Sequence, residues 1–122
     1  MRILIVEDEP VSKMAMKRYL EFMGYEVAVA SNGKEALEES RERRPDVVVS
    51  DWILKDGEDG LYAARELQST HASNIIMVTA HRLEHVREKA QELRVKIAAF
   101  RRKPISLSNL AELVESVAEP KA

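Results

Sequence analysis

The chain has 122 residues, the usual size of one domain, so we expect a single domain over residues 1–122. Hydrophobic residues make up 45% and charged residues 33% of the sequence, which supplies a core and excludes wholesale disorder. The lack of cysteine excludes disulfides, thiolate metal sites and a cysteine nucleophile. A net charge of −2 and the lack of a long apolar run argue against direct nucleic-acid binding and against a membrane partner, so we expect a cytoplasmic protein.

Short apolar runs alternate with amphipathic stretches along the chain, which is typical of βα units around a parallel sheet. Five such units are predicted, with strands at Arg2–Val6, Glu26–Ala30, Val47–Val49, Ile75–Val78 and, less distinctly, Lys96–Arg102. The alternation in Glu26–Ala30 is typical of an edge strand, whereas the unbroken valines of Val47–Val49 indicate a central strand that is covered on both faces.

A helix is predicted after each strand. The first begins at Pro10, stops at Gly24, and has an apolar face made of Val11, Met14, Ala15, Tyr19 and Phe22. The second follows the turn Ser31-Asn32-Gly33, and the third follows the polar loop from Trp52 to Gly60. Ser106 is predicted to cap the last helix.

Polar side chains follow four of the predicted strands. Glu7 and Asp8 come after the first strand, Asp51 after the third, Thr79 after the fourth and Lys103 after the fifth. The carboxyl ends of parallel strands meet at one edge of a sheet, where ligands bind in open α/β folds. We therefore expect three carboxylates, a hydroxyl and an ammonium group to lie close together.

Clustered carboxylates repel each other, by about 4 kcal/mol at about 4 Å for an effective dielectric constant near 20, so they need a cation. Oxygen ligands without histidine or cysteine favour Mg²⁺, which commonly shares its shell with phosphate oxygens. A carboxylate can itself accept a phosphoryl group, and Asp51 is the best nucleophile candidate because it ends the strand with the longest β-branched run.

The chain resembles the receiver domain of two-component response regulators along nearly its whole length. The motifs that carry the resemblance are Ile3-Leu4-Ile5-Val6-Glu7-Asp8-Glu9-Pro10, Ser31-Asn32-Gly33-Lys34-Glu35-Ala36-Leu37, Asp46-Val47-Val48-Val49-Ser50-Asp51, Val78-Thr79-Ala80 and Lys103-Pro104. The resemblance implies an α/β fold of the flavodoxin-like (βα)5 type, a three-layer sandwich with a five-stranded parallel sheet of order 2-1-3-4-5.

The resemblance also assigns roles to residues. Asp51 would be the phosphoacceptor, and Thr79 and Lys103 would contact the phosphoryl oxygens. The Mg²⁺ ligands would be Glu7, Asp8, Asp51 and the backbone carbonyl of Ile53.

Further positions match the switch machinery of the family. Phe100 corresponds to an aromatic residue that swings inward when Thr79 moves toward the phosphoryl group, and Ala80 is small where the family needs room. Lys103-Pro104 would be a cis peptide.

Several features depart from the family pattern. The loop after Asp51 is one residue longer than usual, and Lys55 stands where proline is common. The stretch from Arg82 to Phe100 is slightly long, and Arg101-Arg102 put charge where the fifth strand of the family is more apolar.

The implied function is a Mg²⁺-dependent phosphoacceptor switch in a phosphorelay. Its partners would be a histidine kinase or histidine phosphotransfer protein and a downstream effector protein or missing output domain. The chain would catalyse only its own aspartyl phosphorylation and dephosphorylation. We expect a monomer, or a homodimer that forms through the fourth and fifth βα units.

Three other readings stay open but are disfavoured. A pseudo-receiver that binds partners without phosphorylation is opposed by the intact acidic set with Thr79 and Lys103. A Mg²⁺-dependent phosphohydrolase would need a second acid two residues after Asp51, where Ile53 stands. The segment His81–His85 matches the H-x-x-E-H pattern of one metallopeptidase class, but no third ligand is apparent.

Overall fold

Five strands alternate with five helices in the part of the chain that the structure describes. The computed structural model describes residues 1–51, 60–70, 74–80 and 82–118. The elements are β1 (Arg2–Val6), α1 (Pro10–Phe22), β2 (Glu26–Ala30), α2 (Gly33–Arg43), β3 (Val47–Ser50), α3 (Gly60–Thr70), β4 (Asn74–Thr79), α4 (Leu83–Glu92), β5 (Ala99–Arg102) and α5 (Leu107–Ala118). The predicted loop at 52–59 lies outside the described residues, as do Ile53, Lys55 and His81.

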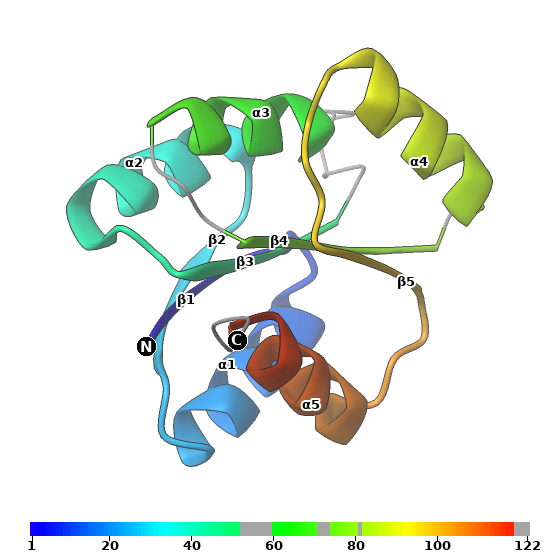
Figure 1. Ribbon diagram of the computed structural model, residues 1–122. Helices are drawn as coiled ribbons and strands as arrows, with labels where there is room; N and C mark the ends of the chain where they lie inside the picture. The colour runs from blue at the N-terminus through cyan, green and yellow to red at the C-terminus, as the bar shows by residue number, and fades with distance from the viewer. Residues whose placement is uncertain (52–59, 71–73, 81, 119–122) are drawn as a thin grey trace.

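The strands form one parallel sheet of order β2-β1-β3-β4-β5. Helices α2, α3 and α4 cover one face, and α1 and α5 cover the other (Figure 1). The three-layer α/β architecture and the strand order are therefore those predicted. Because all strands run in the same direction, their carboxyl ends lie at one edge of the sheet.

Two apolar clusters, one on each face of the sheet, make up the core. Along β1 the side chains alternate between them: Leu4 and Val6 belong to one cluster, and Ile3 and Ile5 to the other. Val47, Val48 and Val49 in β3 are buried in the same alternating way. The unbroken valine run thus marks a central strand, as predicted, because both of its faces are covered by helices.

The apolar face predicted for α1 coincides only in part with the face that meets the sheet, because Tyr19 belongs to both. Three of its residues are exposed, namely Val11 (76%), Met14 (43%) and Phe22 (85%). Leu20 is fully buried instead, and Met16 and Tyr19 pack against the same cluster. The helix carries more apolar residues than one face can hold. Periodicity alone therefore could not decide which apolar face of α1 packs against the sheet.

Strand β5 is shorter than predicted, because it begins at Ala99 rather than at Lys96. The backbone of Lys96 is bound by a side chain of α3: its N–H donates to Gln68 Oε1 at 3.0 Å, and its carbonyl accepts from Gln68 Nε2. Arg94, two residues before Lys96, has a φ of 56°, a conformation that interrupts regular structure. Residues 96–98 therefore lie outside β5, although the prediction placed them in the strand.

Helix starts at the carboxyl edge are held by side-chain caps. Asn32 accepts a hydrogen bond from the N–H of Glu35 at 2.9 Å, and Glu35 accepts one from the N–H of Ser31 at 2.7 Å. Ser106 accepts from the N–H of Asn109 at 3.1 Å, which confirms the predicted cap of α5. These caps fix the loops that surround the strand ends.

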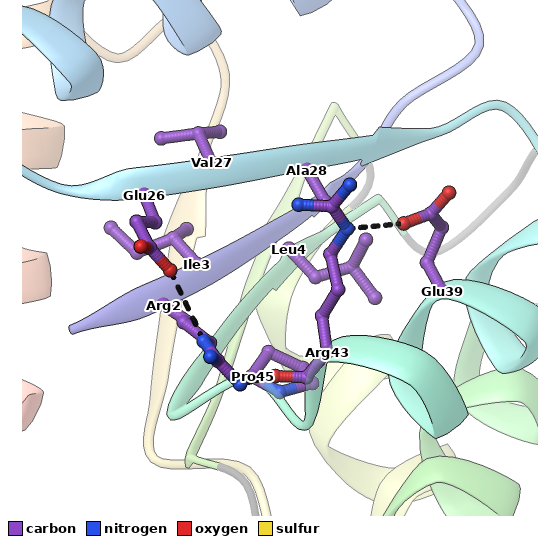
Figure 2. A pocket seen from close by; sticks show the side chains of 9 residues that line it. All are labelled: Arg2, Ile3, Leu4, Glu26, Val27, Ala28, Glu39, Arg43 and Pro45. Atoms are coloured by element: carbon purple, nitrogen blue, oxygen red, sulfur yellow. Dashed lines mark hydrogen bonds and ion pairs between the residues drawn. The ribbon is translucent and has the colours of Figure 1, made fainter.

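The opposite edge of the sheet holds a small cavity. Figure 2 shows its lining, which includes two exposed ion pairs, Arg2–Glu26 at 3.1 Å and Arg43–Glu39 at 3.3 Å. Its volume is about 10 Å³, room for roughly one water molecule. The cavity is too small for a ligand, and exposed ion pairs of this kind contribute little to stability.

Candidate functional site

The strand ends bring the predicted site residues to one edge of the sheet. Glu7 follows β1, Asp51 follows β3, Thr79 ends β4 and Lys103 follows β5. Backbone bonds extend the strand ladders to these positions: the N–H of Asp51 donates to the carbonyl of Val6 at 3.3 Å, and the N–H of Lys103 donates to that of Thr79 at 2.7 Å. The side chains therefore project from regular, well-anchored backbone.

Lys103 joins two of the carboxylates. Its Nζ donates to Glu7 Oε1 and to Asp51 Oδ2, both at 2.9 Å. Glu7 Oε2 also accepts a bond from the N–H of Asp8 at 3.1 Å, so both oxygens of the buried Glu7 are satisfied. The lysine thus supplies the cation that neighbouring carboxylates require.

The two carboxylates differ in accessibility. The side chain of Glu7 is 3% exposed, whereas that of Asp51 is 15% exposed. Glu7 is therefore enclosed, whereas Asp51 is partly accessible to solvent.

The pKa of Lys103 reflects the same geometry. Burial on its own would lower this pKa, but hydrogen bonds and charge attraction from Asp51 and Glu7 outweigh it, so the pKa is raised above 10.5. The ammonium form is therefore maintained at physiological pH. It is positioned to stabilise negative charge on Asp51 or on a group attached to it.

The donor set fits a hard divalent cation. Glu7 and Asp51 each direct an oxygen to one shared cation, the ammonium of Lys103. One or two carboxylates with water and phosphate oxygens suffice for Mg²⁺. In the described ranges, no three acidic, histidine or cysteine side chains cluster as a ready metal site. The Asp8 carboxylate would therefore have to turn toward the pair, and Ile53 lies outside the described residues.

The predicted switch residues lie beside the site on β4 and β5. Thr79 is fully buried at the end of β4, and Ala80 directly after it is exposed. Phe100 is half-buried on β5 and packs against the core cluster under α4. The Lys103–Pro104 peptide is cis, as the resemblance implied.

Two contacts near the site were not predicted. Lys13, in the second turn of α1, donates to Ser31 Oγ at 2.6 Å across the loops that follow β1 and β2. The guanidinium carbon of Arg87 in α4 lies 5.4 Å from the ring centroid of Phe100. Neither contact has a signal in a single sequence, because each joins side chains from separate elements.

The H-x-x-E-H pattern gains no support from the part of it that the structure describes. His85 is an exposed residue of α4.

In the described part of the chain, no helix has the length and hydropathy needed to cross a bilayer.

The sequence matches the response regulator receiver domain family over residues 3–115. The chain belongs to this family. Among curated relatives, the transcriptional regulatory protein PdtaR of Mycobacterium tuberculosis is 34% identical over 115 residues, 93% of this chain and 55% of PdtaR. Response regulator MprA of Mycobacterium leprae is 34% identical over 117 residues, 96% of this chain and 50% of MprA. The chain thus spans about half the length of these relatives.

Solved structures give the same result. A CheY-like response regulator receiver domain protein from Methanospirillum hungatei has a TM-score of 0.85 at 26% identity, covering 94% of this chain and 90% of that one. The signal receiver domain of a modulated diguanylate cyclase from Desulfovibrio desulfuricans has a TM-score of 0.82 at 27% identity, covering 96% of this chain and 92% of that one.

Proposed function

We propose that this chain is a phosphorylation-controlled switch in two-component signalling. Asp51 accepts a phosphoryl group from a histidine kinase or a histidine phosphotransfer protein. The observation that carries the proposal is the placement of Lys103 between Glu7 and Asp51, with one carboxylate enclosed and the other accessible. Membership of the receiver family supports the same assignment.

In the transfer step a carboxylate oxygen of Asp51 attacks the phosphorus of the donor. A phosphorus–oxygen bond forms to Asp51, and the phosphorus–nitrogen bond of a phosphohistidine breaks, so that the electron pair returns to the imidazole. Lys103 then exchanges its hydrogen bond from the carboxylate to a phosphoryl oxygen. In the later dephosphorylation step, water attacks the phosphorus and releases inorganic phosphate, which regenerates the Asp51 carboxylate.

Negative charge on the transferring group must be compensated at the same edge. When bound by Glu7, Asp8 and Asp51, Mg²⁺ would supply part of this compensation. Lys103 supplies a further positive charge from β5. Thr79 ends the neighbouring strand β4, where its hydroxyl can meet a phosphoryl oxygen after a small movement.

The phosphoryl group that leaves the donor stays on Asp51 until water removes it. The chain is therefore not a multi-turnover enzyme on an outside substrate in this proposal, and its output is a changed surface on α4, β5 and α5. An effector domain or a separate effector protein would read this surface, alone or through a homodimer. The length of the relatives, about twice that of the matched region, supports an attached output domain in those proteins.

The test is the intact mass of the protein after incubation with a small acyl phosphate and Mg²⁺. We expect a single phosphoryl adduct. The Asp51→Asn variant and a sample with chelated Mg²⁺ should carry none. The Glu7→Gln variant removes the neighbouring carboxylate of the same site and leaves the acceptor Asp51 in place. It should lower adduct formation, because it weakens the cation site, but it should not abolish the acceptor.

Two results would contradict the proposal. An adduct that persists in Asp51→Asn at full yield would place the acceptor elsewhere. A lack of adduct at early and late times, with Mg²⁺ binding still seen by fluorescence of the single tryptophan, would favour a partner-binding module without phosphorylation.

A further inference from the structure

The ring of Phe100 contacts both the core and a guanidinium group. It packs against the apolar cluster that includes Met77, Val86 and Ala90. The guanidinium carbon of Arg87 lies over the ring, 5.4 Å from its centroid, within the range of a cation–π interaction. The half-buried ring is therefore covered by an exposed, charged side chain of α4.

Arg87 has a possible carboxylate partner on its own helix. Glu84 lies three residues earlier on α4, where side chains of one helix face can meet. Within the described ranges, Arg87 forms no ion pair with Glu84, whereas Lys89 on the same helix pairs with Glu92 at 3.5 Å. The guanidinium contacts the aromatic ring instead of a helix carboxylate.

The ring is linked to the site through the sheet. Phe100 is in register with Met77 on β4, and Thr79 lies two residues after Met77 on the same face of the sheet. Lys103 follows three residues after Phe100 and is bonded to the carbonyl of Thr79 through its N–H. A shift of Thr79 toward a group on Asp51 would thus change the packing on the face of the sheet that the ring occupies.

We infer that Arg87 is a positioning residue for Phe100: it stabilises the ring under α4 and so favours the conformation in which Lys103 pairs directly with Asp51. The inference rests on the proposed function, because it assigns Arg87 an energetic role in the response to phosphorylation. Loss of the guanidinium should release the ring and raise the fraction of molecules that respond. The ratio of responding to non-responding molecules should increase by about two- to five-fold. This is the range that a cation–π contact at an exposed site permits.

The chain offers a direct probe, since it contains only two phenylalanines. Fluorine-labelled phenylalanine gives one NMR signal for Phe100 and one for Phe22, which is 85% exposed and serves as an internal reference. A Phe22→Leu variant assigns the two signals. Without any phosphoryl donor, Arg87→Gln should shift the Phe100 signal and leave the Phe22 signal unchanged.

Two further variants separate this role from a general effect of charge. Arg87→Lys keeps a cation on the ring and should restore a large part of the wild-type signal. Lys89→Gln removes one positive charge from the same helix away from the ring and should behave as wild type. With acyl phosphate and Mg²⁺, Arg87→Gln should raise the ratio of the second Phe100 signal to the first above that of wild type.

Unchanged Phe100 signals in Arg87→Gln, or equal shifts in Lys89→Gln, would overturn the inference. It would also be overturned if the adduct forms but the signal ratio is the same in wild type and Arg87→Gln. A lack of adduct in wild type would instead contradict the proposed function and the switching role with it. The donor-free shift would still decide whether Arg87 holds the ring.

Discussion

Lys103 donates a hydrogen bond of 2.9 Å to Asp51 across an intervening strand. Lys103 follows β5 and Asp51 follows β3, and β4 lies between these strands in the sheet. The same ammonium also reaches Glu7 after β1, so one side chain joins the ends of three strands. The arrangement couples the charge of the site to the packing of the whole carboxyl edge.

Removal of Lys103 should destabilise the fold. In Lys103→Met, the buried Glu7 carboxylate loses its cation and faces Asp51 without compensation. We expect a loss of about 1–2 kcal/mol in the free energy of unfolding at neutral pH, less than for a fully enclosed pair because the lysine side chain is 33% exposed. Urea unfolding of the two proteins measures the difference. Equal stabilities would contradict the bridging role.

The contribution of Lys103 should also depend on pH in one direction. Since its folded-state pKa is raised above 10.5, its pairing stabilises the protein fully below 10.5 and is lost as the pH rises through the folded-state pKa. The free energies of unfolding of wild type and Lys103→Met should therefore differ by a constant amount from neutral pH up to about 10.5. The difference should shrink as the pH rises through the folded-state pKa of Lys103. A difference that grew with alkaline pH would be inconsistent with the raised pKa.

The polar strand endings made most of this site predictable from sequence. Glu7, Asp51, Thr79 and Lys103 each stand at the end of a strand, and a parallel sheet brings such ends to one edge. What could not be predicted is which groups touch. Lys103 bridges Glu7 and Asp51 because its long side chain crosses β4, and no spacing in the sequence specifies that reach.

The corrected orientation of α1 gives a paired test. Leu20 is fully buried, so Leu20→Ala should lower the free energy of unfolding by about 2–5 kcal/mol through lost packing and a cavity. Phe22 is 85% exposed, so Phe22→Ala should change stability by no more than about 0.5 kcal/mol. Thermal unfolding of both variants measures the contrast. The reverse ranking would restore the face predicted from periodicity.

The start of α1 should respond to acid. Glu9 caps the helix by accepting from the N–H groups of Ser12 at 2.6 Å and Val11 at 3.1 Å, and these bonds lower its pKa below 4.5. Its contribution is therefore present above 4.5 and is lost as the pH falls through the lower folded-state value. NMR titration of the Glu9 carboxyl should give a midpoint under 4.5, and Ser12→Pro, which removes one donor, should raise it. A midpoint at or above 4.5 in wild type would exclude the cap.

The fold as a whole was predictable wherever one pattern dominated. The valines of Val47–Val49 have a single interpretation as a doubly covered strand, and β3 bears it out. Periodicity failed in α1, where apolar residues occur on both sides of the helix. It also failed at Lys96, whose backbone is bonded to the side chain of Gln68 rather than to a neighbouring strand.

The most direct measurement is the chemical location of the phosphoryl group. After treatment with acyl phosphate and Mg²⁺, borohydride reduction converts an aspartyl phosphate to homoserine, which peptide mass spectrometry then locates. We predict homoserine at position 51 and unmodified carboxylates at Glu7 and Asp8. Reduction at either of those residues, or a phosphorylated protein with an intact Asp51, would contradict the assignment of Asp51 as the phosphoacceptor.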